Sequence, residues 1–180
     1  MMLRKAIKIV ESDDLTIIRK VVASEPTFVF VMGSTGSGKN YIVNKYFKNI
    51  DLVDIDKYMA ELADGGDTRK YISKSIAMAN KSLETNFKKQ KSIIQVGTGG
   101  NLKGLENKLI KAKSYDFKTA IILVDSGLEK SRSRNIDRAN KGDQRLVPDW
   151  KVDVSYKASM ANYETLKKSE YVDFYLLIKN

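Results

Sequence analysis

The sequence predicts an α/β fold, in which helices sandwich a five-stranded parallel sheet. Short apolar runs of strand length alternate with longer stretches whose apolar residues recur at helical spacing. A glycine-rich segment follows the first apolar run directly and opens a helix. Such alternation is typical of βα units around a parallel sheet. The 180 residues fit a single domain that spans residues 1–180.

Each expected element follows from its own pattern. Continuous apolar runs predict strands at residues 27–32, 52–55, 92–96, 119–124 and 171–178. Helical spacing predicts helices at residues 40–46, 69–88, 102–110, 128–139 and 151–168, with one more before the first strand. Ile72, Ile76 and Leu83 belong to the apolar stripe of the second of these helices. Right-handed crossovers place the loops after the strands along one edge, where we expect the chemistry.

Composition limits the possible chemistry. The chain has no cysteine and no histidine, which excludes a disulfide partner, a zinc thiolate site and a cysteine nucleophile. Any acid–base step must therefore use Asp, Glu, Lys, Tyr or water. The 32 Lys and Arg against 22 Asp and Glu give a net charge of +10, which favours polyanionic partners or reflects only solubility and triphosphate affinity.

Targeting signals are not expected in this sequence. Residues 1–10 are basic, but they lack the apolar run and small residues of a secretory signal. No apolar run reaches the ~20 residues that span a bilayer. We therefore expect a cytoplasmic protein without a membrane partner.

The glycine-rich segment matches the phosphate-binding pattern G-x-x-x-x-G-K. Glycines allow successive backbone N–H groups to point inward, and the following helix N-terminus adds attraction for phosphate oxygens. A lysine here adds a point charge on the β and γ phosphates of a nucleoside triphosphate. The predicted nucleotide-binding residues are Gly33, Ser34, Thr35, Gly36, Ser37, Gly38, Lys39 and Asn40.

Asn40 departs from the pattern, which normally ends in Ser or Thr as a Mg²⁺ ligand. An amide oxygen can still bind a hard cation or one of its waters. Asn40 is therefore the candidate metal ligand, with weaker metal binding or a degraded site as the alternative.

Two carboxylates lie at the exit of the second strand. Asp54 and Asp56 share a face if the strand continues to Asp56, and like-charge repulsion then raises one pKa. A carboxylate at this place can accept the proton of an attacking hydroxyl. We prefer Asp56 as this base because it lies farther out. The alternative is that one carboxylate only caps the next helix.

The loop after the third strand contains three glycines and few polar side chains. Thr98 is expected to contact the acceptor or a magnesium-bound water. The alternative is a turn between strand and helix that Asn101 caps.

An arginine-rich segment at residues 128–148 is expected to form a lid. Arg134 and Arg138 share a helix face at i,i+4, and Arg145 would return near that face beyond Gly142. Phosphate oxygens would offset the mutual repulsion of such a stripe, and arginine stabilises charge in phosphoryl transfer. A solvated basic face, or a surface that follows a nucleic-acid backbone, are the alternatives.

Four segments together resemble the P-loop kinase group that holds zeta toxins and polynucleotide kinases. They are GSTGSGK, VDID, VGTGGN and LVDSGLEKSRSRNIDR, each after one of the first four strands, within residues 28–162. The resemblance implies a P-loop NTPase fold, ATP or another NTP, and Mg²⁺. The residues that it implies are the loop lysine Lys39, the activating carboxylate Asp56 (or Asp54), and the lid arginines Arg134, Arg138 and Arg132 or Arg145.

The sequence thus leads to three hypotheses. The first is a kinase that transfers the γ-phosphate of ATP to a hydroxyl of a nucleotide, nucleic acid or related acceptor. The second is a nucleic-acid-binding module that uses a nucleotide as a switch. The third is a degenerate domain that binds NTP without transfer. Motifs for a nucleotide-sugar acceptor are not matched, so the substrate of zeta toxins is not implied.

Overall fold

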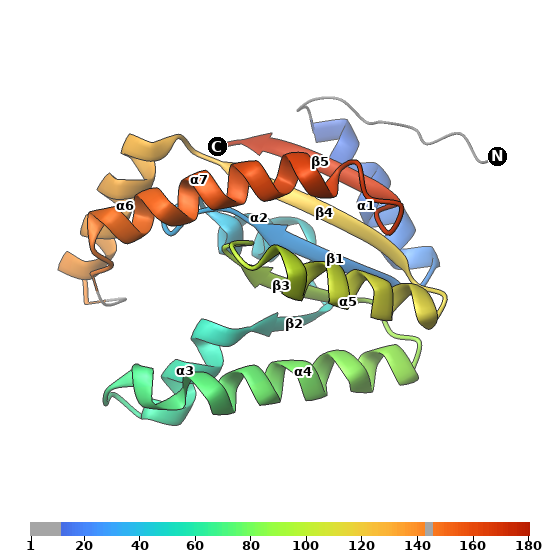
Figure 1. Ribbon diagram of the computed structural model, residues 1–180, viewed down its shortest axis with the longest axis horizontal. Coiled ribbons are helices and arrows are strands. Elements are labelled where there is room, and N and C mark those ends of the chain that lie inside the picture. The colour runs from blue at the N-terminus through green and yellow to red at the C-terminus, as the bar shows by residue number, and fades with distance from the viewer. Residues whose placement is uncertain (1–11, 143–145) are drawn as a thin grey trace.

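A five-stranded parallel sheet forms the centre of the protein, as the sequence predicts (Figure 1). The structure is a computed structural model that describes residues 12–142 and 146–180. The strand order is β2-β3-β1-β4-β5, and every neighbouring pair is parallel. The strands are β1 (Thr27–Met32), β2 (Asp51–Asp54), β3 (Ile93–Gly97), β4 (Lys118–Asp125) and β5 (Phe174–Lys179).

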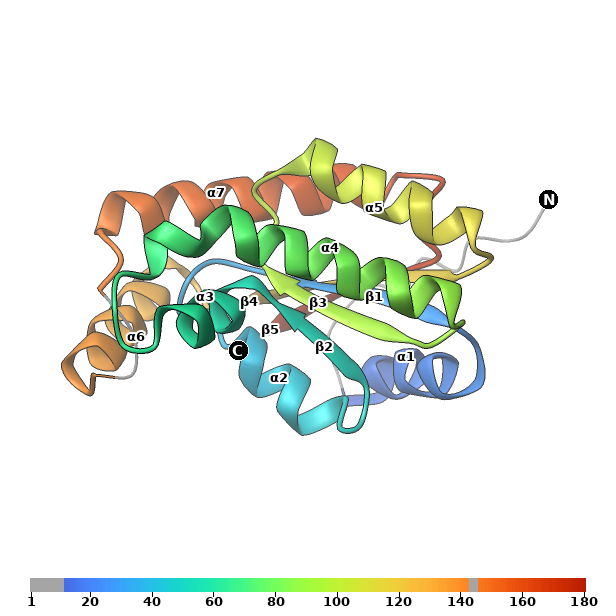
Figure 2. The same ribbon diagram turned by 90° about the horizontal axis from the view of Figure 1, so that it is seen from below.

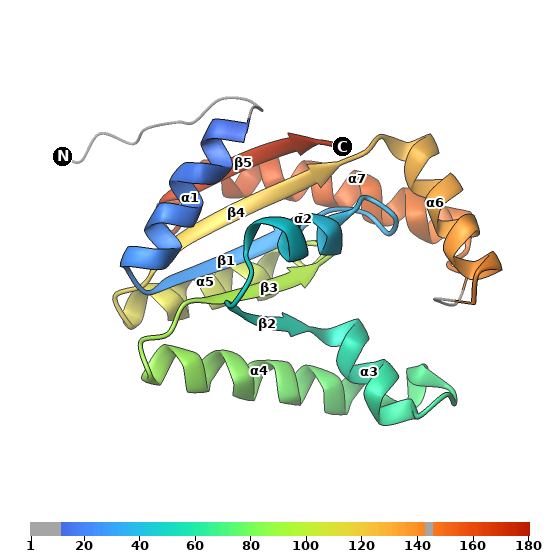
Figure 3. The same ribbon diagram turned by 180° about the vertical axis from the view of Figure 1, so that it is seen from behind.

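Helices cover both faces of this sheet (Figures 1 and 3). Helices α4, α5 and α7 pack on one face, and α1 and α2 pack on the other. The helices are α1 (Ser12–Ser24), α2 (Lys39–Tyr46), α3 (Ile55–Ala63), the 3₁₀ turn η1 (Thr68–Tyr71), α4 (Ile72–Lys88), α5 (Leu102–Ser114), α6 (Leu128–Asn140) and α7 (Asp149–Leu166). In the described part of the chain, no helix combines the length and apolar character needed to cross a membrane.

Strand β1 shows why its sequence is apolar throughout. Phe28 and Phe30 belong to the core under α4, α5 and α7, whereas Val29 and Val31 belong to the core under α1 and α2. A central parallel strand is buried on both faces, so a continuous apolar run replaces the alternation of a half-exposed strand.

The strand order also indicates at which edge of the sheet a ligand would bind. Because β3 lies on one side of β1 and β4 on the other, the chain direction across the sheet switches at β1. Ligands of open α/β sheets bind beyond the carboxyl ends of the strands at such a switch point. Helix α6 lies beyond this edge in Figures 1 and 2.

One helix prediction is wrong in detail. The predicted helix 69–88 is divided into η1 and α4, and Ile72 and Ile76 at the start of α4 are exposed. The apolar stripe is buried only from Ala79 onward, because the first turns of α4 extend past the sheet. Trp150 near the start of α7 is 63% exposed, so it does not contribute to the core.

Candidate functional site

The glycine-rich segment forms a tight loop between β1 and α2. Gly36 and Gly38 have φ values of 84° and 95°, which side chains with a Cβ rarely adopt. A Cβ at Gly36 would lie 2.3 Å from the carbonyl oxygen of Ser131 in α6, so glycine is also needed for this close contact. The backbone N–H of Ser37 donates to the carbonyl oxygen of Ser34 at 3.1 Å and closes the turn.

This loop forms one wall of a cavity of about 610 Å³. Thr35, Gly36, Gly38, Lys39 and Asn40 line the cavity. The other three predicted loop residues, Gly33, Ser34 and Ser37, lie outside this lining and are buried. The hydroxyl of Ser34 is 2.8 Å from that of Ser131, and this contact ties the loop to α6.

Lys39 holds its ammonium group against the loop. Its Nζ donates to the carbonyl oxygens of Gly33 at 2.8 Å and Ser34 at 2.7 Å. Desolvation of this group lowers the pKa of Lys39 to about 8, with Arg138 adding to the effect and Asp56 opposing it. The result is a cation that a phosphate group would stabilise strongly.

The two carboxylates after β2 have different environments. Strand β2 ends at Asp54, and Asp56 lies in the first turn of α3, so the expectation of one shared strand face is wrong. Asp54 is the N-cap of α3: its Oδ1 accepts from the backbone N–H groups of Asp56 at 3.0 Å and Lys57 at 3.3 Å. Desolvation, followed by the charge of Asp54, raises the pKa of Asp56 against the opposing effect of Lys39 and Arg138. Both carboxylates line the cavity.

Asn40 lies beside this pair. Its Nδ2 donates to Oδ2 of Asp54 at 3.4 Å, so an amide and a carboxylate meet at the edge of the loop. Oxygen atoms of these two groups are of the kind that Mg²⁺ prefers, and together with phosphate oxygens they fit a Mg²⁺ site. In the described ranges, no cluster of three acidic side chains suits a metal without such phosphate ligands.

Helix α6 brings two of the predicted arginines to the opposite wall. Arg134 and Arg138 both line the cavity, and Nη1 of Arg134 donates to the carbonyl oxygen of Gly36 at 3.5 Å. Arg132 lies outside this lining, because its guanidinium pairs with Asp153 of α7 at 2.9 and 2.6 Å. Arg145 lies outside the described residues.

The end of β3, with Val96 and Gly97, and Thr98 in the loop that follows also line the cavity. Asn101 is the N-cap of α5 and accepts from the backbone N–H of Gly104 at 2.9 Å, as the structural alternative predicted. Thr98 is available to a ligand at the same time, so the two interpretations of this loop are compatible.

Sequence patterns missed several residues of the cavity. Tyr41, Asp137, Lys141 and Asn180 also line it, and the Nδ2 of Asn180 donates to the carbonyl oxygen of Ser37 at 2.9 Å. The i,i+3 spacing of Asp137 from Arg134 was the available signal for one of them. Asn180 follows β5, far from the loop in sequence, and no local pattern marks it.

Comparison with solved structures shows the fold. A chain of the PezAT toxin–antitoxin system of Streptococcus pneumoniae matches with a TM-score of 0.67 and 14% identity, over 98% of this chain and 81% of that one. A chain of the Pnkp1/Rnl/Hen1 RNA repair complex matches with 0.65 and 18%, over 78% and 46%. A chain of AvrRxo1-ORF1:-ORF2 with ATP matches with 0.66 and 20%, over 86% and 54%.

The chain shares the P-loop NTPase fold of these proteins. This confirms the fold that the resemblance to zeta toxins and polynucleotide kinases implies. The chain spans about half the length of the matched chains in the RNA repair and AvrRxo1 structures. A scan against protein-family models gave no match, and neither did a search of curated proteins.

Proposed function

We propose that the protein is an ATP-dependent kinase that phosphorylates a hydroxyl of a nucleotide, nucleic acid or related acceptor. The observation that carries this proposal is the single cavity in which Lys39, Asp56, Arg134 and Arg138 meet at the phosphate loop. Phosphoryl transfer is achieved mainly by positioning and by stabilising charge on the transferred group. An anion-binding loop, a carboxylate base and two guanidinium groups are suited to these tasks.

Each residue then has a role in the transfer. The loop N–H groups and Lys39 hold the β and γ phosphates. The acceptor oxygen bonds to the γ-phosphorus as the bond from phosphorus to the bridging oxygen of ADP breaks. Asp56 takes the proton of the hydroxyl, and its raised pKa suits a base that works near neutral pH. Arg134 and Arg138 stabilise the charge that spreads over the transferred oxygens.

Mg²⁺ would neutralise phosphate charge in this reaction. Asn40 and Asp54 are the side chains that would hold it or its waters. The Asn40→Ser variant restores the usual hydroxyl at this position. We expect it to bind Mg²⁺·ATP at least as tightly as the natural chain.

The test uses γ-labelled ATP, Mg²⁺ and four acceptor pools: nucleosides, nucleoside monophosphates, nucleotide sugars and oligonucleotides. Label that moves to one pool, and no longer moves with Lys39→Ala, would establish the kinase and its acceptor class. Asp56→Asn should lower the transfer rate by about 10²–10⁴-fold while ATP binding persists. Asp51→Asn, at the exposed start of β2, is the matched control and should transfer normally. Normal transfer by Asp56→Asn would show that the base is assigned wrongly.

The net charge of +10 favours a second candidate, a nucleic-acid-binding module switched by nucleotide. This candidate predicts binding to DNA or RNA that weakens steeply with salt and changes between ATP and ADP. ATP binding without transfer to any pool and without nucleic-acid binding would instead indicate a degenerate site, in which Asn40 is the first residue to examine.

A further inference from the structure

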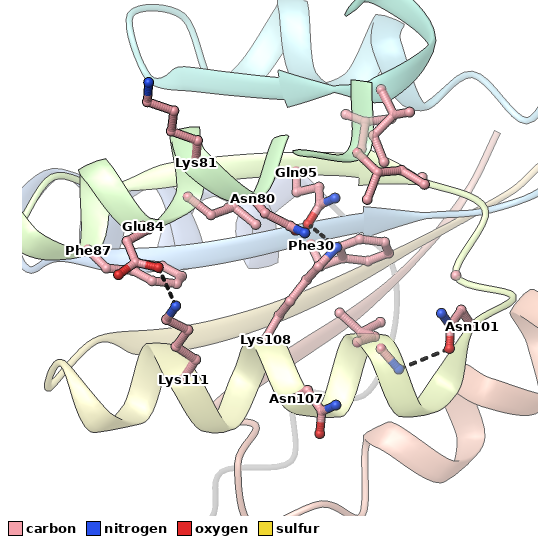
Figure 4. Close-up of a pocket in the computed structure, with 18 of the residues that line it drawn as sticks. Phe30, Asn80, Lys81, Glu84, Phe87, Gln95, Asn101, Asn107, Lys108 and Lys111 are labelled. Atoms are coloured by element: carbon pink, nitrogen blue, oxygen red, sulfur yellow. Dashed lines mark hydrogen bonds and ion pairs between the residues drawn. The ribbon is translucent and has the colours of Figure 1, made fainter. Parts of the chain in front are cut away.

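A second, larger groove runs between α4 and α5 (Figure 4). Its volume is about 950 Å³. Leu83 and Phe87 of α4, Leu105 of α5 and Phe30 of β1 supply apolar surface to it. Sites for small organic molecules have volumes of roughly 300–1,000 Å³, with mostly apolar walls and a few placed polar groups. The groove thus has the size and the character of a binding site.

The groove meets the phosphate-loop cavity at the end of β3. Val96, Gly97 and Thr98 line both of them, and Asp56 lies in the phosphate-loop cavity beyond this shared segment. A molecule seated in the groove can therefore extend a hydroxyl past Thr98 toward the proposed base. The groove is in the place where the part of an acceptor that does not react would lie.

The charges around the groove are mainly positive. Its lining contains four lysines and one acidic residue, Glu84. Glu84 is shared between Lys88 at 3.1 Å and Lys111 at 2.5 Å. In Figure 4 the side chain of Lys81 extends away from the other labelled residues. Lys108 is therefore the cation to consider inside the groove.

Lys108 reaches from α5 across the groove to the sheet (Figure 4). Its Nζ donates to Oε1 of Gln95 at 3.1 Å, and the described residues supply no carboxylate partner within ion-pair distance. Burial lowers the pKa of Lys108, which records the cost of holding a charge in this place. A neutral amide offsets this cost only in part, and an anionic group would offset more of it.

We propose that the groove between α4 and α5 is the acceptor subsite, and that Lys108 binds an anionic phosphate group of the acceptor. This inference rests on the proposed kinase function. The apolar walls would hold the organic part of the acceptor, and the amide of Asn80, which also lines the groove, would bind its polar groups. The acceptor class is thus a phosphate ester of a small organic molecule, and an uncharged analogue with the same hydroxyl would bind poorly.

Steady-state kinetics with matched acceptors tests the proposal. The acceptors are nucleosides, their 5′-monophosphates and nucleoside diphosphate sugars, which separates the neutral compounds from two sources of phosphate ester. Lys108→Met keeps most of the length of the side chain and removes its charge. It should raise KM for the phosphate ester by about 10- to 100-fold, the range for a charge-assisted hydrogen bond. KM for ATP and kcat should change little, and Lys108→Arg should restore most of the affinity.

Lys103→Met is the matched control, since Lys103 is exposed on the same helix and lies outside the groove. An unchanged KM in Lys108→Met, or a natural chain that uses nucleosides as well as their monophosphates, would overturn the proposal. If no acceptor is phosphorylated, the kinase function itself fails. Calorimetry on protein saturated with a non-hydrolysable ATP analogue then decides about the groove. Binding of the same phosphate esters that weakens in Lys108→Met supports the subsite, and no binding overturns it.

Discussion

Proton uptake at Lys39 is expected when ATP binds to the phosphate loop. Burial lowers the pKa of this lysine to about 8, and its ammonium donates to the carbonyl oxygens of Gly33 and Ser34. A phosphate group beside Nζ favours the charged form, so binding should return the pKa to about 10.4, the value of a free lysine, or above. ATP therefore binds the protonated protein more tightly than the neutral form.

The magnitude follows from the two pKa values. At pH 8 about half of the free protein has lost this proton, so binding takes up about half a proton per ATP. Apparent ATP affinity should fall by about tenfold between pH 7 and pH 9. The last proton of a phosphate leaves near ~6, so ATP itself contributes little to this change. The folding stability of the ATP-free protein changes with pH in the opposite direction to the ATP affinity. Between the folded pKa and the unfolded pKa of Lys39, the unfolded chain binds more protons than the folded one, so the contribution of Lys39 makes stability rise with pH.

Titration calorimetry at pH 8, in buffers with different heats of ionisation, measures the proton uptake directly. The ATP affinity measured at pH 7, 8 and 9 is an independent check. Lys39→Arg is the control, because its guanidinium stays charged throughout this pH range and should show neither effect. Equal heats in all buffers, together with an affinity that is flat from pH 7 to pH 9, would refute the reasoning.

Two further predictions concern stability, measured by chemical denaturation. Gly36→Ala should lower the free energy of unfolding by about 2–4 kcal/mol, because left-handed strain adds to a clash with the carbonyl of Ser131. Gly65→Ala has nearly the same φ, 83° against 84°, with nothing within 4 Å, and should lose only about 1 kcal/mol; equal losses would contradict the role of the clash. Ser75 is buried in α4, and within the described ranges its Oγ has no hydrogen-bond partner, so Ser75→Ala should stabilise by about 1 kcal/mol. Ser73→Ala, on the exposed side of α4, measures the effect of helix propensity alone. If it raises the free energy of unfolding as much as Ser75→Ala does, the unpaired buried hydroxyl is not the cause of the gain.

Local patterns predicted those parts of the site that one segment forms by itself. The loop from Gly33 to Asn40 joins a buried strand to a helix because its glycines permit the required backbone. Arg134 and Arg138 reach the same cavity because i,i+4 spacing places them on one face of α6. Such features depend on residues close in sequence, so a single segment is enough to predict them.

Patterns were less reliable where a residue has two possible local roles. A carboxylate after a strand can continue the strand or cap the next helix. Asp54 caps α3 because the strand ends there and does not continue to Asp56, as the alternation argument required. The side chain of Arg132 depends on a partner 21 residues away, Asp153, which α7 presents only after packing against α6. Neither outcome has a signal within its own segment.

The sequence alone determined the α/β fold, the phosphate loop and the basic face of α6, because these follow from periodicity, from glycine and from charge within single elements. Only the tertiary structure decided what meets at the carboxyl ends of the strands. It placed Asn180 on the loop, and it brought Lys108 of α5 to Gln95 of β3. These contacts join segments that are far apart in the chain, and they form only when helices pack on a sheet whose strand order is set by the burial of both faces.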